Sequence, residues 1–305
     1  MGSPLLSRSA SATPHGDEGY FPRGRSMLRR VMGERAVGLI YGQRALMIGA
    51  LDPRNYVGTA LSTGSAKRPY ARLAHTAKAF ETIYFGSRAE ADRMLGLIHG
   101  MHRTVKGTLP EDAGRYPAGT PYSAYDPDLM LWTIAVNADS ALELYETLVR
   151  RLTDHEREEL WQDFVLLGEL FGLDRSHAPA TYPDFCDYWH ARLHSDTLYL
   201  TDGAREGGLR SAFGVPVPTF GWPGMQVAEL VIAGTLPERV RDLYGISWSP
   251  VQQAAHVVAV QGIRRSRRLV PHRVRRGGNT KLFDMVTAAE RGLVQAGRQR
   301  WVLRP

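Results

Sequence analysis

Two histidines lie three residues apart in the stretch LGLIHGMHRTVKG, which covers residues 95–107. Neutral imidazole is the commonest metal ligand in proteins, so both are candidates for metal binding or acid–base chemistry. On a helical wheel, one apolar face collects Met94, Leu97, Ile98, Met101 and Val105. His102 lies beside this face and is predicted to point into a buried seam, whereas His99 is predicted to lie at the surface.

A buried histidine has two interpretations. It can be a core residue that donates one ring N–H to a carbonyl, or it can be a ligand. The single Cys186 excludes an intramolecular disulfide and any multi-cysteine metal site, and no HExxH motif is present. A haem needs only one axial histidine and an apolar slot, so it is a metal group that this sequence allows.

The preceding segment, PYARLAHTAKAFETIYFG, has an apolar helical face formed by Leu73, Ala77, Phe80 and Tyr84. Arg72 and Thr76 are one turn apart at the edge of this face, and His75 falls nearly opposite to it. Arg72 and Thr76 either serve their own helix or line a polar corner of a ligand pocket. An arginine fork suits a propionate or an iron-bound oxygen species.

Helical periodicity dominates the elements that must position these residues, and strand alternation is scarce. Helices are predicted over 26–50, 69–85, 88–106, 127–149, 153–172, 184–195, 201–212, 223–233, 237–244, 249–269 and 281–297. Ser87 and Glu90 form a capping box, Asp126 precedes Pro127 at a helix start, and Gly107 is expected to end the helix of the two histidines. The prediction is a single all-α domain.

Length and composition fit one large domain over residues 23–300, with 43% hydrophobic residues among 305. Residues 1–22 lack the apolar core of a secretory signal and are predicted to be a disordered leader. The longest apolar stretch is too short to span a membrane. A single cysteine is typical of a protein in the reducing cytoplasm, which is the expected location.

The net charge of +7 and the pI near 9.6 raise the question of an anionic partner. Seven arginines lie between Arg264 and Arg276. They are either a solvated helix and loop or a site for an anionic ligand such as a propionate or for an anionic membrane surface. Specific nucleic-acid binding is not expected, because no DNA- or RNA-binding motif accompanies them. The oligomeric state is left open.

The order of four blocks resembles a known family. These are RLAHTAKAF, YFG, MHRTVKG and YSAYDPDLMLW. They are similar to the R-x-x-[RK]-T-x-x-F, [YF]-G, M-H-x-x-V-x-G and Y-x-A-x-D-P-x-L-x-W patterns of the family that unites MpaB-type oxygenases with bacterial rubber oxygenase (latex-clearing protein). RALMIGALDP and LPERVRDLYGISWSP extend the resemblance to about residues 20–270.

This resemblance implies an all-α fold that encloses one b-type haem. His102 matches the family's proximal iron ligand, while Arg72 and Thr76 match the helix that passes over the other haem face. Tyr122 and Tyr125 are candidates for contact with the haem propionates. Relatives use O2 to cleave carbon–carbon double bonds in isoprenoid chains.

Two residues depart from the family pattern. His75 stands where relatives usually have Arg or Lys, and it either approaches the iron or faces solvent, as the wheel favours. Asp52 replaces the histidine of an "HP" dipeptide. Asp52 and Glu81 could assist proton transfer, although surface or capping roles are favoured for both. Trp132 is interpreted as core.

The leading hypothesis is therefore a haem b-dependent oxygenase that uses O2 to oxidise, or to cleave at a carbon–carbon double bond, a small apolar substrate that is isoprenoid-like or a secondary metabolite. One alternative is a haem protein without oxygenase turnover, such as a sensor, a carrier or a peroxidase. The other is a haem-free basic protein that binds nucleic acid or a membrane peripherally through its arginines.

Overall fold

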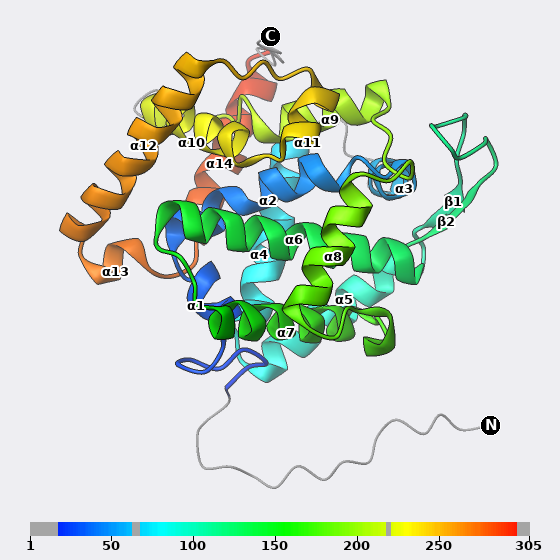
Figure 1. Cartoon of the computed structure of the whole chain (residues 1–305), viewed down its shortest axis with the longest axis horizontal. Helices are drawn as coiled ribbons and strands as arrows, with labels where there is room; N and C mark the ends of the chain where they lie inside the picture. Colours follow the sequence, from blue (N-terminus) through cyan, green and yellow to red (C-terminus); the bar gives the residue numbers. More distant parts are fainter. Residues whose placement is uncertain (1–17, 63–67, 218–220, 298–305) are drawn as a thin grey trace, which may run out of the picture.

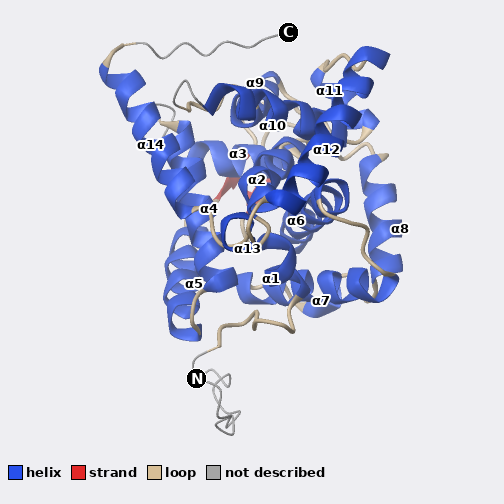
Figure 2. Cartoon of the chain, turned by 90° about the vertical axis from the view of Figure 1, so that its left-hand side faces the viewer, coloured by secondary structure: helices blue, strands red, loops and turns tan. Residues whose placement is uncertain are grey.

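The computed structural model describes residues 18–62, 68–217 and 221–297, and it confirms the all-α prediction. The described residues form fourteen α-helices, one 3-10 helix and one small hairpin (Figure 1). Their bounds are α1 Met27–Met32, α2 Arg35–Gly49, α3 Pro53–Ser62, α4 Pro69–Phe85, α5 Arg88–His102, β1 Lys106–Thr108, β2 Pro121–Ser123, α6 Pro127–Leu148, α7 Asp154–Phe171, η1 Arg175–His177, α8 Tyr182–Leu193, α9 Asp202–Ala212, α10 Trp222–Thr235, α11 Glu238–Tyr244, α12 Pro250–Leu269, α13 His272–Arg275 and α14 Thr280–Gln295. In Figure 2, helices surround the small hairpin and loops connect them. No helix in the described ranges is both long and apolar enough to cross a membrane.

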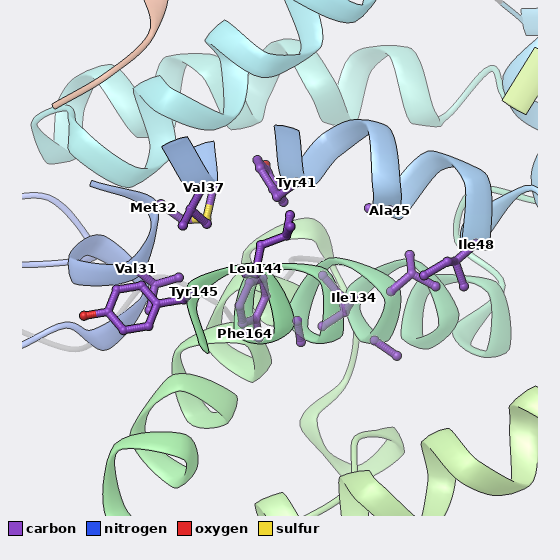
Figure 3. Packing of buried hydrophobic residues seen from close by; sticks show 14 of the residues in the cluster. Val31, Met32, Val37, Tyr41, Ala45, Ile48, Ile134, Leu144, Tyr145 and Phe164 are labelled. Atoms are coloured by element: carbon purple, nitrogen blue, oxygen red, sulfur yellow. The ribbon is translucent and has the colours of Figure 1, made fainter. Parts of the chain in front are cut away.

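The core lies between α2 and α6, the pair of helices that packs most extensively. Tyr41, Ala45 and Ile48 of α2 lie along α6, with Leu144 of α6 near Tyr41, and Phe164 of α7 lies next to Leu144 (Figure 3). Trp132 is fully buried here and donates from Nε1 to the Gly49 carbonyl at 3.2 Å, so it is a core residue as predicted. Burial of apolar surface on this scale is the main term that stabilises the fold.

The predicted helix starts are confirmed where a cap was identified. The Ser87 hydroxyl accepts from the Glu90 N–H, and the Glu90 carboxylate accepts from the Ser87 N–H, which completes a capping box. Asp126 accepts from the N–H groups of Asp128 and Leu129, so it is a helix cap and not a catalytic acid. Local hydrogen-bond chemistry therefore fixes the starts of α5 and α6.

The expected helix over 26–50 is instead two helices, α1 and α2. Glu34 between them is extended, and its buried carboxylate accepts hydrogen bonds from Arg267 and Arg276, far along the chain. A backbone bridge also joins Glu34 to Arg276. The tertiary ion cluster thus interrupts a segment that is locally compatible with one continuous helix.

The expected helix over 88–106 ends early, at His102. A turn over 103–105 leads into β1, which pairs with β2, and Gly107 lies opposite Tyr122. A Cβ at Gly107 would lie 2.8 Å from the Tyr122 hydroxyl, so a glycine is needed for this approach. Gly107 is therefore a strand residue under an aromatic ring and not the end of the helix.

The predicted leader is too long at its C-terminal end. Phe21 is fully buried against Tyr84, and the Tyr20 hydroxyl donates to Asp92 at 2.5 Å. Burial of a whole phenylalanine ring anchors residues 18–22 to the domain. Residues 1–17 lie outside the described residues, as do residues 298–300 at the other predicted boundary.

Candidate functional site

His99 is a structural residue of the last turns of α5. Its Nδ1 lies 2.9 Å from the Tyr125 hydroxyl, and its Nε2 lies 3.0 Å from the Leu170 carbonyl oxygen. Both ring nitrogens are thus occupied within the protein, and the side chain is half-buried. The prediction that His99 lies at the surface is wrong, because the His99 ring bridges α5 to α7 and to the start of α6.

His102, one turn later, has the opposite environment. Its Nδ1 is buried and has no hydrogen-bond partner in the described part of the chain. The rings of Phe171 and Tyr125 flank the imidazole of His102, and their centroids lie 6.0 and 6.1 Å from the centroid of the imidazole. Burial, and secondly the nearby His99, lower the pKa of His102, so its imidazole is neutral at neutral pH. A neutral ring with an unused buried nitrogen is chemically able to bind a metal ion.

The apolar face predicted for α5 is rotated relative to the observed one. Leu97 is 70% exposed and Met101 is exposed as well, although both were expected in the buried seam. The buried side consists instead of Ala91, Leu95, Ile98, His99 and His102. These positions follow the i, i+4, i+7, i+8, i+11 spacing of one helical face. The packing of α4 and α7 selects this face, and it carries both histidines.

On α4, three predicted site residues lie on the accessible side. Arg72 is half-buried and donates to the Thr59 carbonyl of α3 at 3.4 Å, and burial lowers the pKa of its guanidinium. His75 and Thr76 are exposed. The exposure of His75 agrees with its position on the wheel. Thr76 was expected at the edge of the buried surface, but its side chain is exposed to solvent. No hydrogen bond between the described residues joins these three side chains directly to His102.

Helix α3 lies between the α4 residues and the segment that follows His102. Its Thr59 carbonyl accepts from Arg72, and its Gly58 faces the Tyr122 ring and Val105. A Cβ at Gly58 would lie 3.3 Å from the Tyr122 ring, so Tyr122 rests directly on α3. Helix α3 was missed in the sequence, although Asp52 and Pro53 repeat the Asp–Pro start signal of α6.

Asp52 is a structural carboxylate. It is fully buried, caps α3 through the Arg54 N–H, and forms ion pairs with Arg54 and Arg192 at 3.0 and 2.8 Å. Paired in this way, it is not placed to accept a substrate proton. Its departure from the family histidine is therefore accommodated by two arginines that neutralise it.

Glu81 also has a structural role, at the junction of α4 and α14. Its carboxylate accepts from the Asn279 N–H and from the Thr280 hydroxyl at the start of α14. In return, Glu290 of α14 is buried and accepts from the N–H groups of Tyr70 and Ala71 at 3.1 and 2.7 Å. Each helix thus supplies a carboxylate to the N-terminus of the other, where free N–H groups and the helix dipole favour negative charge.

The structure therefore brings some of the predicted residues together and leaves others apart. His99, His102 and Tyr125 form one cluster, to which α7 adds Phe171, a residue that the sequence analysis missed. Tyr125 serves His99 in this cluster and is not free for a propionate. Because Phe171 comes from a helix far along the chain, no local pattern identifies it.

Comparison with known proteins assigns the family. The catalytic domain described as "ER-bound oxygenase mpaB/B'/Rubber oxygenase" matches residues 29–270, and the chain belongs to this family of oxygenase-type domains. It is also similar to the uncharacterized proteins Mb2261 of Mycobacterium bovis and Rv2237 of Mycobacterium tuberculosis. Each is 26% identical over 213 residues, which cover 68% of this chain and 78% of the relative. No solved structure matches the chain.

The residues present fit a cofactor that takes one protein ligand. No group of three or more His, Cys, Asp or Glu side chains in the described ranges is arranged to hold a metal ion by itself. Four other buried polar atoms share the partnerless state of His102 Nδ1, namely Arg68 Nε, Tyr188 OH, Arg192 Nε and Asn279 Oδ1. Of these five atoms, only the imidazole nitrogen is a good ligand for iron.

Proposed function

We propose that the protein is a haem b-dependent oxygenase that uses O2 to oxidise an apolar, isoprenoid-like substrate. The observation that supports this most directly is the buried, partnerless Nδ1 of the neutral His102. A native protein rarely leaves a buried polar atom unpaired, because the loss of its hydrogen bonds to water costs about 1–3 kcal/mol of folding free energy. A bound haem iron on this imidazole would account for its environment, and membership of an oxygenase family supports the reaction class.

When bound, a haem supplies the iron at which O2 is activated for attack on a carbon–carbon double bond. His102 contributes one ring nitrogen, and because its pKa is lowered, iron binding at neutral pH needs no prior loss of a proton. Arg72 keeps its positive charge and offers a fork of N–H donors to a propionate or to an oxygen atom. Thr76 adds a hydroxyl one turn away, and Tyr122 a phenol.

The chain's only cysteine, Cys186, is exposed and unpaired. This supports the proposal that the protein works in the reducing cytoplasm. The proposal of a small apolar substrate is supported by membership of the family alone.

A visible absorption spectrum tests the cofactor. Protein expressed with a haem precursor should show a strong Soret band, and the His102→Ala variant should lose it or shift it markedly. His75→Ala is the matched control, because His75 is an exposed histidine and should leave the band unchanged. Absence of a Soret band in the parent, together with no uptake of added haemin, would overturn the proposal.

Oxygen consumption tests the reaction. The haem-loaded parent should consume O2 in the presence of a polyisoprenoid alkene and form carbonyl products, whereas the haem-free protein should not. A haem-loaded parent that consumes no O2 but oxidises a dye with peroxide, far faster than free haem does, would identify a peroxidase instead.

A further inference from the structure

The corner formed by the end of α12 and by α13 separates the arginine cluster into two groups. Four of the seven arginines are bound internally. Arg264 donates to the carbonyls of Glu146 and Thr147, and Glu34 is paired with the other three, which are Arg267, Arg275 and Arg276. These four hold the end of α12 and the segment after it against α1, α2 and α6.

The other three arginines, Arg265, Arg268 and Arg273, are exposed. None of them has an ion pair or a side-chain hydrogen bond to another described residue. No Asp or Glu occurs anywhere from residue 243 to residue 283, so the chain supplies no acidic neighbour in sequence. Their charge is therefore available to an outside partner.

Exposed apolar side chains occur on the same two helices, α12 and α13, as these charges. Leu269 is 86% exposed and Val258 is 71% exposed, and Val251 and Val274 are exposed too. Val251, Val258 and Arg265 are spaced by seven residues and Leu269 follows four later, so all four lie on one outer face of α12. This face spans about 27 Å of helix at 1.5 Å per residue.

The position of α12 leaves this face open. It packs on α10 and, less extensively, on α6. Figure 1 shows α12 descending along one edge of the molecule to α13, and the same side faces the viewer in Figure 2. An open hollow of about 440 Å³ lies at the corner where α12 ends and α13 begins, and it is lined in part by Arg267, Arg268 and Arg275.

We propose that the outer face of α12, together with Arg265, Arg268, Leu269, Arg273 and Val274, docks the protein on a membrane surface that contains anionic phospholipids. A helix that lies in such an interface buries apolar side chains at the level of the headgroups while cations beside them meet lipid phosphates. Arginine stems pack on apolar surface while their guanidinium groups reach outward. Arg268, which is not among the arginines bound to Glu34, lines the hollow and can offer its guanidinium to a lipid phosphate.

Charge alone would equally suit a nucleic acid, but the apolar half of the surface would not. Phosphodiester backbones are bound by cations and polar donors, and an exposed row of valines and a leucine adds nothing to such binding. The combination of an apolar row and unpaired arginines favours the lipid surface. The proposal does not depend on haem binding.

Vesicle co-sedimentation with the full chain tests it. The parent should sediment with vesicles of mixed phosphatidylglycerol and phosphatidylcholine, should release as salt increases, and should not sediment with pure phosphatidylcholine. The triple variant Arg265→Gln, Arg268→Gln, Arg273→Gln should lose roughly a hundredfold in partitioning, from about fivefold for each arginine. The matched control Arg23→Gln, Arg93→Gln, Arg151→Gln removes the same charge from exposed positions elsewhere and should bind far more like the parent.

The apolar half has its own variant, Val258→Gln with Leu269→Gln, which should lower partitioning roughly tenfold without a change in charge. Equal losses in the two arginine triples would overturn the proposal, since the corner would then not be special. An unchanged affinity of the apolar variant would overturn it as well. So would tighter binding to duplex DNA than to the anionic vesicles at the same salt concentration, because that would identify a nucleic-acid surface.

Discussion

The interface between α2 and α6 and the last turn of α5 treat buried polar groups in opposite ways. In the interface, Arg44 is almost fully buried and each of its three guanidinium nitrogens donates a hydrogen bond, to Asp139, to Ser140 or to the Thr235 carbonyl. At the end of α5, His102 retains a buried nitrogen with no partner among the described residues. Both regions belong to the same helical domain.

This difference separates an arginine that stabilises the fold from the histidine that we propose as a cofactor ligand. Unpaired buried groups cost free energy, so most buried polar groups that serve only the fold find a partner within the protein, although Arg192 Nε and Asn279 Oδ1 do not. A buried polar group that lacks a partner and lies next to aromatic rings is expected where a bound molecule supplies that partner. The pair His99 and His102 shows the same contrast within a single helix.

The largest effect is expected from breaking the completed network. Arg44→Met should lower the free energy of unfolding by about 3–5 kcal/mol, because it leaves the half-buried Asp139 carboxylate, the buried Ser140 hydroxyl and the Thr235 carbonyl without their donor. Urea denaturation of the haem-free protein measures this. Arg30→Met removes an exposed arginine paired with Glu156 at 3.2 Å and should cost less than about 1 kcal/mol. Similar losses in both variants would contradict the contrast.

A smaller effect is expected at the junction of α4 and α14. Glu290→Ala removes the carboxylate that accepts from the Tyr70 and Ala71 N–H groups, and should lower the free energy of unfolding by about 2 kcal/mol. Gln295→Ala, at an exposed position of the same helix, is the control and should stay within about 0.5 kcal/mol of the parent. A loss no larger than that of the control would show that the reciprocal caps contribute little.

The two histidines provide the sharpest form of the comparison. In the haem-free protein, His99→Leu should cost about 1–2 kcal/mol through its two lost hydrogen bonds, whereas His102→Leu should be neutral or slightly stabilising. In haem-loaded protein, His102→Leu should have the larger effect, because it alone would abolish the Soret band. A haem-free His102→Leu variant as unstable as His99→Leu would indicate that His102 is an ordinary core residue.

The smallest expected effect concerns pH. Because burial lowers the pKa of His102 in the folded state, the unfolded chain binds more protons as the pH falls. The stability of the haem-free protein should therefore be complete above about pH 6.5, the unfolded value, and should decline as the pH falls below it. His102→Leu should flatten this decline. His256, whose pKa burial also lowers, contributes in the same direction in every variant.

The sequence predicted the fold class and most helix starts because caps are local. Ser87 with Glu90, and Asp126 before Pro127, act within four residues of themselves. The errors occur where distant segments decide. Glu34 divides the first predicted helix because two arginines more than 230 residues away bind it. The helix after Asp52 was a different case, since its Asp–Pro signal was present and was overlooked.

At the site, the sequence identified the helix and the candidate ligand but not the rotation of that helix. The observed buried face of α5 carries His99 as well, and its partners Tyr125 and Leu170 come from other segments. A wheel weighs only the residues on the helix itself, whereas the buried face is set by what packs on it. That is why Leu97 and Met101, apolar as they are, remain exposed.

The exchange of carboxylates between α4 and α14 also bears on how this chain relates to its family. The family match ends at residue 270, yet the start of α4 inside it is capped by Glu290 from outside it. The helix that carries Arg72 and Thr76 is therefore secured at its first turn by α14, which lies outside the residues that the family model matches. Without α14, those two N–H groups would lose their acceptor, so the anchoring of α4 depends on a helix that follows the matched region in the chain.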